Sequence, residues 1–188
     1  MVDDDIAHRV LEGDTYEQAA VVVTRAFPIS LERKIQLGIA GLLVSVLLAP
    51  LLSLQQDAIV ALEGAEPAAF RLGTFVFLGI LTVFVAGLLL IGLESRTRSL
   101  STLDRARKLV RIEEFLMWYQ LLGLAFVVIG TAIAAAGLVS PDIVRLLYEF
   151  DVQVYGSAGI VLIDVWAISG IGGLMAMALV GLRSLSGA

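Results

Sequence analysis

Cysteine is absent from the 188-residue chain, and histidine occurs once, at His8 in the polar N-terminal segment. Without cysteine the chain cannot form a disulfide, a thiolate zinc site or an iron–sulfur centre, and it has no cysteine nucleophile. One histidine also excludes a multi-histidine metal site within a single chain. We therefore expect neither a metal nor a cofactor.

Asparagine is absent too, and lysine occurs only at Lys34 and Lys108, so arginine supplies nearly all of the 13 basic residues. Without asparagine there is no acceptor for N-linked glycosylation. Acidic residues number 18, and an acid-rich, lysine-poor composition suits a protein that must stay hydrated at high salt. We interpret this bias as the mark of a halophilic archaeal source, although a GC-rich genome would also favour arginine over lysine.

Charge of either sign is scarce. Charged residues make up 16% of the chain, against about a quarter in soluble domains, while hydrophobic residues make up 59% and the mean hydropathy is +0.92. Four apolar windows are long enough to cross a hydrocarbon core of about 30 Å, which takes roughly 20 helical residues. They are residues 35–56, 72–93, 115–140 and 156–182. The predicted fold class is all-α, an integral membrane four-helix bundle.

Basic residues near the ends of these windows predict the orientation, because cytoplasmic loops retain lysine and arginine. Ten of them fall in residues 25–34, the loop 94–114 and the C-terminal end, against only Arg71 and Arg145 in the other two loops. We expect both termini in the cytoplasm (N-in, C-in), residues 35–183 as one membrane domain, and a location in the cell membrane.

Short cytoplasmic amphipathic helices are predicted outside the windows. Asp14 followed by Glu17 resembles a capping box, and the helix that it starts should end by Pro28. Its apolar residues could lie on the membrane surface or on the cytoplasmic loop. Apolar residues also recur near helical spacing through 101–120, so the third span should begin as a cytoplasmic helix and enter the membrane without a break.

One charged side chain interrupts the fourth window. Asp164 lies about seven residues from the outer start of that window, around 10 Å deep by helical rise. The other windows place hydroxyls at a similar depth, on Ser45, Thr82 and Thr131. Asp164 is either a cation or proton site, or a protonated acid that bonds to these hydroxyls or to another subunit. The lack of a basic residue at its depth favours the second interpretation.

Small residues in the fourth window predict close helix packing. Ser169 with Gly173, and Gly172 with Ala176, form pairs of small residues four positions apart, a spacing that lets helices approach closely. The segment contains no phosphate-binding glycine motif. It should pack within the bundle or between protomers.

The basic loop 94–114 is a candidate for contact with anionic lipid head groups. Its candidate side chains are Arg105, Arg107, Lys108 and Arg111. The loop holds six basic and four acidic residues, too small an excess to predict a nucleic-acid partner. The alternative is a solvated loop whose charges only set the topology.

No catalytic motif occurs, so we do not expect an enzyme. Glu113 and Glu114 are adjacent on a helix, point about 100° apart, and suit a water-facing helix entry. We expect an accessory or scaffolding subunit of a membrane complex, whose partners are the lipid bilayer and other membrane-protein subunits or copies of itself. The alternative is a small homo-oligomeric ion or proton channel or transporter that uses Asp164. Polar residues that cluster at one depth rather than along a path favour the first function.

Overall fold

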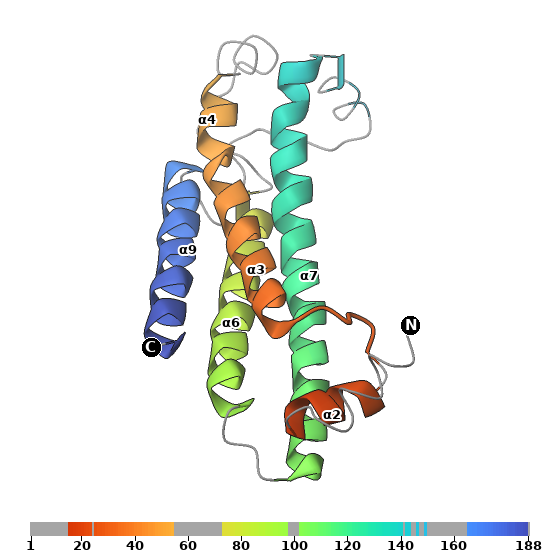
Figure 1. Ribbon diagram of the computed structural model, residues 1–188. Helices are drawn as coiled ribbons and strands as arrows, with labels where there is room; N and C mark the ends of the chain where they lie inside the picture. The colour runs from red at the N-terminus through yellow and green to blue at the C-terminus, as the bar shows by residue number, and fades with distance from the viewer. Residues whose placement is uncertain are drawn as a thin grey trace, which may run out of the picture.

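The computed structural model describes residues 15–23, 25–54, 73–97, 102–140 and 165–187, together with positions 142, 143, 146 and 149. Six helices have described bounds (Figure 1): α2 (Thr15–Val22), α3 (Leu31–Val46), α4 (Leu48–Ser53), α6 (Gly73–Thr97), α7 (Leu103–Val139) and α9 (Val165–Gly187). The four longest run side by side, α4 extends α3, and α2 lies beside the start of α7. That shared end of the bundle is called the α2 end below.

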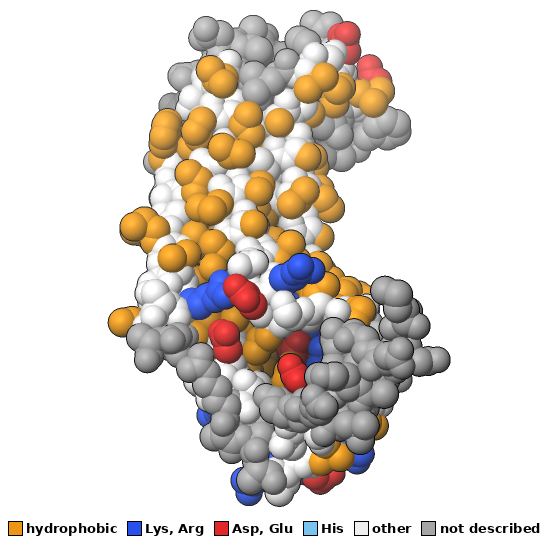
Figure 2. Space-filling view, in the orientation of Figure 1, with side chains coloured by type: hydrophobic (Ala, Val, Ile, Leu, Met, Phe, Trp, Pro, Cys, Tyr) orange, Lys and Arg blue, Asp and Glu red, His pale blue; other side chains and the backbone are white. Residues whose placement is uncertain are grey.

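Four helical stretches are long and apolar enough to cross a membrane, at 31–53, 73–97, 103–136 and 165–185. The predicted all-helical chain with four membrane-crossing helices is therefore confirmed in its coarse form. Apolar side chains cover the upper part of the bundle, and charged ones gather toward the α2 end (Figure 2). Within the segment expected as a loop at 94–114, α6 continues to Thr97 and α7 already begins at Leu103. Residues 156–164 of the fourth window, Asp164 included, lie outside the described residues.

Helix α7 is continuous over 37 residues, about 55 Å at the helical rise, which exceeds the thickness of a hydrocarbon core. Of the unbroken helix expected through residues 101–120, the part from Leu103 onward is thus present. The first turns of α7 pack against α2 through a small apolar cluster of Ala19, Ala106 and Val110. The N-terminal helix thus packs on the start of α7, within the segment 94–114.

The first membrane stretch is interrupted at Leu47, between α3 and α4. Pro50 explains the interruption, because it has no N–H to donate to the carbonyl of Val46 and its ring crowds that carbonyl. A side chain from α9 completes the backbone hydrogen bonding there. The amide of Ala49 donates to Ser169 Oγ at 3.0 Å, and the Ser169 hydroxyl donates to the carbonyl of Ser45 at 3.2 Å.

Helices α6 and α7 meet through two glycines that face each other. A Cβ added to Gly79 would lie 2.7 Å from the carbonyl oxygen of Gly123, and one added to Gly123 would lie 2.8 Å from the carbonyl oxygen of Gly79. Both distances are shorter than van der Waals contact, so a side chain on either residue would force the backbones apart. Glycine at these two positions permits the close crossing.

Candidate functional site

The most polar buried site in the described part of the chain surrounds Lys34, in the first turn of α3. Helix α3 begins after Ser30, whose hydroxyl accepts from the amide of Arg33 at 3.4 Å, and this start directs Lys34 toward α7. Lys34 is fully buried. Its Nζ lies 2.7 Å from Glu113 Oε1 and 3.0 Å from Glu114 Oε1. One ammonium thus bridges two adjacent carboxylates.

The second oxygen of each carboxylate is bound by the segment that precedes α3. The hydroxyl of Tyr16 donates to Glu113 Oε2. The backbone amides of Ala26 and Phe27 donate to Glu114 Oε2 at 2.9 and 3.2 Å. Each of the four carboxylate oxygens therefore accepts at least one hydrogen bond. We call Lys34, Glu113, Glu114 and Tyr16 the ion cluster.

Gln120 extends the ion cluster toward the middle of the bundle. Its Nε2 donates to the carbonyl of Lys34 at 2.7 Å, and both groups are buried. Gly38 provides the space, since a Cβ there would lie 3.3 Å from Gln120 Cδ and closer still to its amide nitrogen. The Oε1 atom of Gln120 is buried and has no hydrogen-bond partner among the described residues.

The ring of Tyr16 also contacts a second cation, Arg25. The guanidinium carbon of Arg25 lies 5.8 Å from the centre of the Tyr16 ring, within the range of a cation–π contact. Burial raises the pKa of the Tyr16 hydroxyl well above its usual range, and the hydrogen bond and negative charge of Glu113 raise it further, against a smaller opposing effect of Arg25. Tyr16 therefore stays a neutral hydrogen-bond donor at physiological pH.

This arrangement joins the N-terminal segment to α7. Separating charges from water is costly, and a buried ion pair is tolerated when its geometry is good and its remaining donors and acceptors are satisfied. The ion cluster meets that condition for its carboxylates. An open cation site would need carboxylate oxygens that are free to bind the ion. Here each of the four oxygens already accepts a hydrogen bond. Across the described ranges, moreover, no group of three or more acidic or histidine side chains could hold a metal ion.

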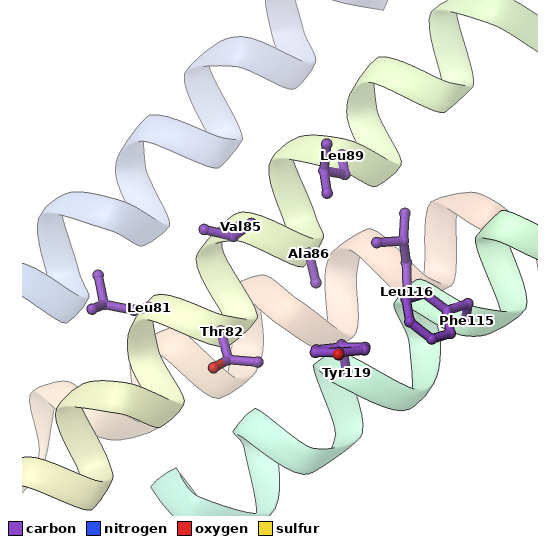
Figure 3. A pocket seen from close by; sticks show the side chains of 8 residues that line it. All are labelled: Leu81, Thr82, Val85, Ala86, Leu89, Phe115, Leu116 and Tyr119. Atoms are coloured by element: carbon purple, nitrogen blue, oxygen red, sulfur yellow. The ribbon is translucent and has the colours of Figure 1, made fainter.

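The hydroxyls predicted to surround Asp164 lie in different places. Ser45 donates to the carbonyl of Leu42 at 2.6 Å and faces α9. Thr82 donates to the carbonyl of Leu78 at 2.7 Å and lines a groove between α6 and α7 (Figure 3). Thr131 is buried, and its Oγ1 has no partner in the part of the chain that the structure describes. Asp164 itself falls outside that part.

Most of the predicted packing residues of the fourth window turn toward α3. Ser169 and Ala176 are buried, and Gly172 lies against Ser45, because a Cβ there would be 3.3 Å from both the Ser45 Cβ and the carbonyl oxygen of Leu42. Gly173 is less constrained, with only Val46 near, at 3.4 Å from an added Cβ. The predicted lipid-contact residues lie on α7, where Arg105, Lys108 and Arg111 are exposed and Arg107 is half-buried.

The ion cluster is absent from the sequence-based interpretation, which is wrong about Glu113. That residue was expected to face water at a helix entry, whereas it is 1% exposed and paired with Lys34. The sequence nevertheless contained a signal for this ion pair. Lys34 immediately precedes the first apolar window and Glu114 immediately precedes the third. Opposite charges at the same end of two spans predict an ion pair between them.

No protein family, no curated protein and no solved structure matches this chain. The ion cluster and the packing of the four long helices are therefore the observations that bear on its function.

Proposed function

We propose that this chain is a small multi-pass membrane protein that acts as an accessory or scaffolding subunit of a membrane complex through helix–helix contacts. The observation that carries the proposal is the saturated ion cluster. Its carboxylates are fully used in fixing the segment from Tyr16 to Lys34 onto α7. Such a cluster stabilises one arrangement of helices rather than offering a site for a passing ion.

The described interior of the bundle supports the same function. Along α7, the buried positions between Gln120 and Thr131 are Gly123, Val127 and Gly130, an apolar interval of about 16 Å at the helical rise. The buried hydroxyls of Ser45 and Ser169 both donate to backbone carbonyls. A channel or transporter needs polar groups along a path. On α7 the buried residues of this interval are all apolar, and the Thr82 hydroxyl beside Gly123 also donates to a backbone carbonyl.

Helix α9 offers the surface for a partner helix. It is the least covered of the four membrane helices, with 33% of its most apolar window buried, against 50% for α6. Its uncovered side includes Gly170 and Gly181, where an added Cβ would meet nothing within 4 Å, and the 68% exposed Leu174. Small residues beside a large apolar one on an uncovered face allow close approach of another membrane helix. We propose that both termini are cytoplasmic, on the strength of the basic residues at the α2 end.

Photo-crosslinking and a flux assay together test this function. A photoreactive residue at Leu174 should crosslink to another membrane protein in native membranes. The matched position is Val128 on α7, which is also exposed and should give no such product. The purified protein in liposomes should carry no proton or cation current. Flux that the parent supports and Asp164→Asn abolishes would instead establish the alternative, a homo-oligomeric channel or transporter.

A further inference from the structure

A long groove separates α6 from α7 on the surface of the bundle. It consists of two adjoining cavities of about 380 and 420 Å³, which share Leu89 and Leu116 as lining residues. Figure 3 shows the first cavity, whose lining comes from both helices, with Thr82 and Ala86 of α6 on the side of Tyr119 of α7. Gly92 widens the second cavity, because a Cβ there would meet nothing within 4 Å.

The lining of the groove changes from apolar to polar along its length. Its lining on α6 extends from Leu81 to Arg96, about 22 Å at the helical rise. Half of a hydrocarbon core is about 15 Å, so the groove is long enough to run from one membrane boundary past the middle of the bilayer. The first cavity is lined almost entirely by apolar groups, whereas Ser95 and Arg96 line the second. One end is apolar and the other is polar.

Further basic residues stand at the polar end. Leu109 and Ile112 line the second cavity, and Arg105 and Lys108 each lie four residues before one of them, on the same face of α7. Both are exposed. In the described segments 94–97 and 102–112, five basic residues stand against two acidic ones. The charge at this end of the groove is therefore positive.

We propose that this groove binds one anionic phospholipid. An acyl chain lies along α6 between Leu81 and Leu89, and the phosphate of the head group contacts Arg96, Arg105 and Lys108. A ligand that is long and apolar with a single anionic end matches this lining better than a membrane-spanning helix. Basic pockets between membrane helices favour anionic head groups in general. The proposal does not depend on the accessory function, since it concerns a different face from α9.

Lipid binding to the purified full-length chain tests the proposal. Native mass spectrometry in a neutral detergent at about 0.1 M salt, where charges still act over about 10 Å, would compare phosphatidylglycerol, phosphatidylcholine and free glycerol phosphate. We expect one phosphatidylglycerol to be retained per chain, phosphatidylcholine to bind more weakly, and glycerol phosphate not to be retained. Replacing both Arg105 and Lys108 by Gln should weaken phosphatidylglycerol binding at least about tenfold.

Two further variants separate the groove from diffuse surface charge. Arg33 is exposed on α3, a helix that lines neither cavity, so Arg33→Gln should leave binding unchanged. Val85 is 51% exposed at the groove, and Val85→Trp should fill the apolar cavity and weaken the binding of both phospholipids. The thermal stability of each lipid-free variant is first compared with that of the lipid-free parent. If the double variant unfolds, Val85→Trp still tests the groove.

Several results would overturn the proposal. Equal losses in Arg33→Gln and the double variant would indicate a diffuse charge effect. Equal affinity for the two phospholipids would remove the role of the head group, and retention of free glycerol phosphate would indicate an anion site without a lipid. A photoreactive residue at Val85 that crosslinks to a protein instead of a lipid would assign the groove to a partner helix or to a second copy of the chain.

Discussion

Ser169 and Ala49 lie 120 positions apart in the sequence, yet the hydroxyl oxygen of Ser169 accepts the backbone amide proton of Ala49 at 3.0 Å. In a regular helix that amide would donate to the carbonyl of Ser45, to which the Ser169 hydroxyl donates instead. The hydroxyl is thus inserted into the backbone hydrogen-bond pattern where Pro50 interrupts the helix. Insertion of a side chain in this way is one of the few causes of a sharp helix break.

Ser169→Ala should destabilise the protein because it leaves the amide of Ala49 and the carbonyl of Ser45 buried without partners. A buried group left unsatisfied costs about 1–3 kcal/mol, and we expect a loss in that range in detergent unfolding. Ser184 is the matched control, since it is exposed on the same helix and its hydroxyl donates to the carbonyl of Gly181, within its own helix. Equal stability losses for Ser169→Ala and Ser184→Ala would contradict the inserted hydroxyl.

The facing glycines of α6 and α7 predict a second difference in stability. Gly123→Ala places a methyl group 2.8 Å from the carbonyl oxygen of Gly79, and the backbones must separate, at a cost of about 1–3 kcal/mol. Gly92→Ala on α6 meets open space and should be neutral or slightly stabilising. Thermal unfolding of both variants in one detergent gives the comparison. Tolerance of Gly123→Ala would mean that α6 and α7 do not cross here.

Removal of the central cation should disrupt the ion cluster. Lys34→Met leaves the buried carboxylate of Glu113 and the partly buried one of Glu114 without their shared counter-ion, and breaking a buried pair costs about 3–5 kcal/mol. Changing Glu113 to Met as well should restore part of that stability, because one unpaired charge is then also removed. Arg33→Met is the control at an exposed neighbouring position. A double variant no more stable than Lys34→Met alone would show that the two side chains are not coupled.

Contact between α2 and α7 should weaken at alkaline pH. The pKa of the Tyr16 hydroxyl is raised from its ordinary value of 10.0 by burial and by Glu113. A raised pKa in the folded state means that the contribution of Tyr16 is complete below pH 10 and is lost as pH rises above it. A cysteine introduced at Ala19, which is buried, should label faster as the pH passes about 10, after correction for the reactivity of a free thiol.

Tyr16→Phe provides the control for that pH dependence. It removes the ionisable hydroxyl and the hydrogen bond to Glu113, so labelling at position 19 should be faster at neutral pH and nearly flat through the alkaline range. A parent protein whose corrected labelling rate does not change with pH would contradict the assigned role of Tyr16.

The coarse fold was predictable because each membrane helix is marked locally by a long apolar run. The helix break was less visible, since Pro50 lies in an apolar segment and a proline in a membrane helix need not interrupt it when neighbouring groups satisfy the backbone. Ser169 is that neighbour here, and only the packing of α9 on α3 reveals it. The small size of Ser169, Gly172 and Ala176 indicated close packing, but not which helix they would meet.

The ion cluster was harder to predict because its members are far apart in sequence and each has a simpler explanation. Lys34 counts as a topology signal, Glu113 as a solvated helix residue, and Tyr16 as part of a polar tail. Their pairing depends on the relative depth of α3 and α7, which local patterns do not give. The crossing at Gly79 and Gly123 was hidden for a related reason, since 18 glycines offer many equivalent choices.

Cysteine labelling in intact cells tests the proposed orientation, and the structure sharpens that test. The end of α9 lies beside the start of α3, where Arg183 Nη2 is 2.6 Å from Glu32 Oε1, so Thr102 and Ser186 should be accessible from the same side. The excess of basic residues there predicts the cytoplasmic side. Single cysteines at Thr102 and Ser186 should resist an impermeant reagent until the cells are lysed, while one at Glu149 should react at once. Immediate labelling at both Thr102 and Ser186 would show that the orientation is the reverse of the proposed one, with the same fold. Labelling at only one of them would contradict the helix arrangement itself.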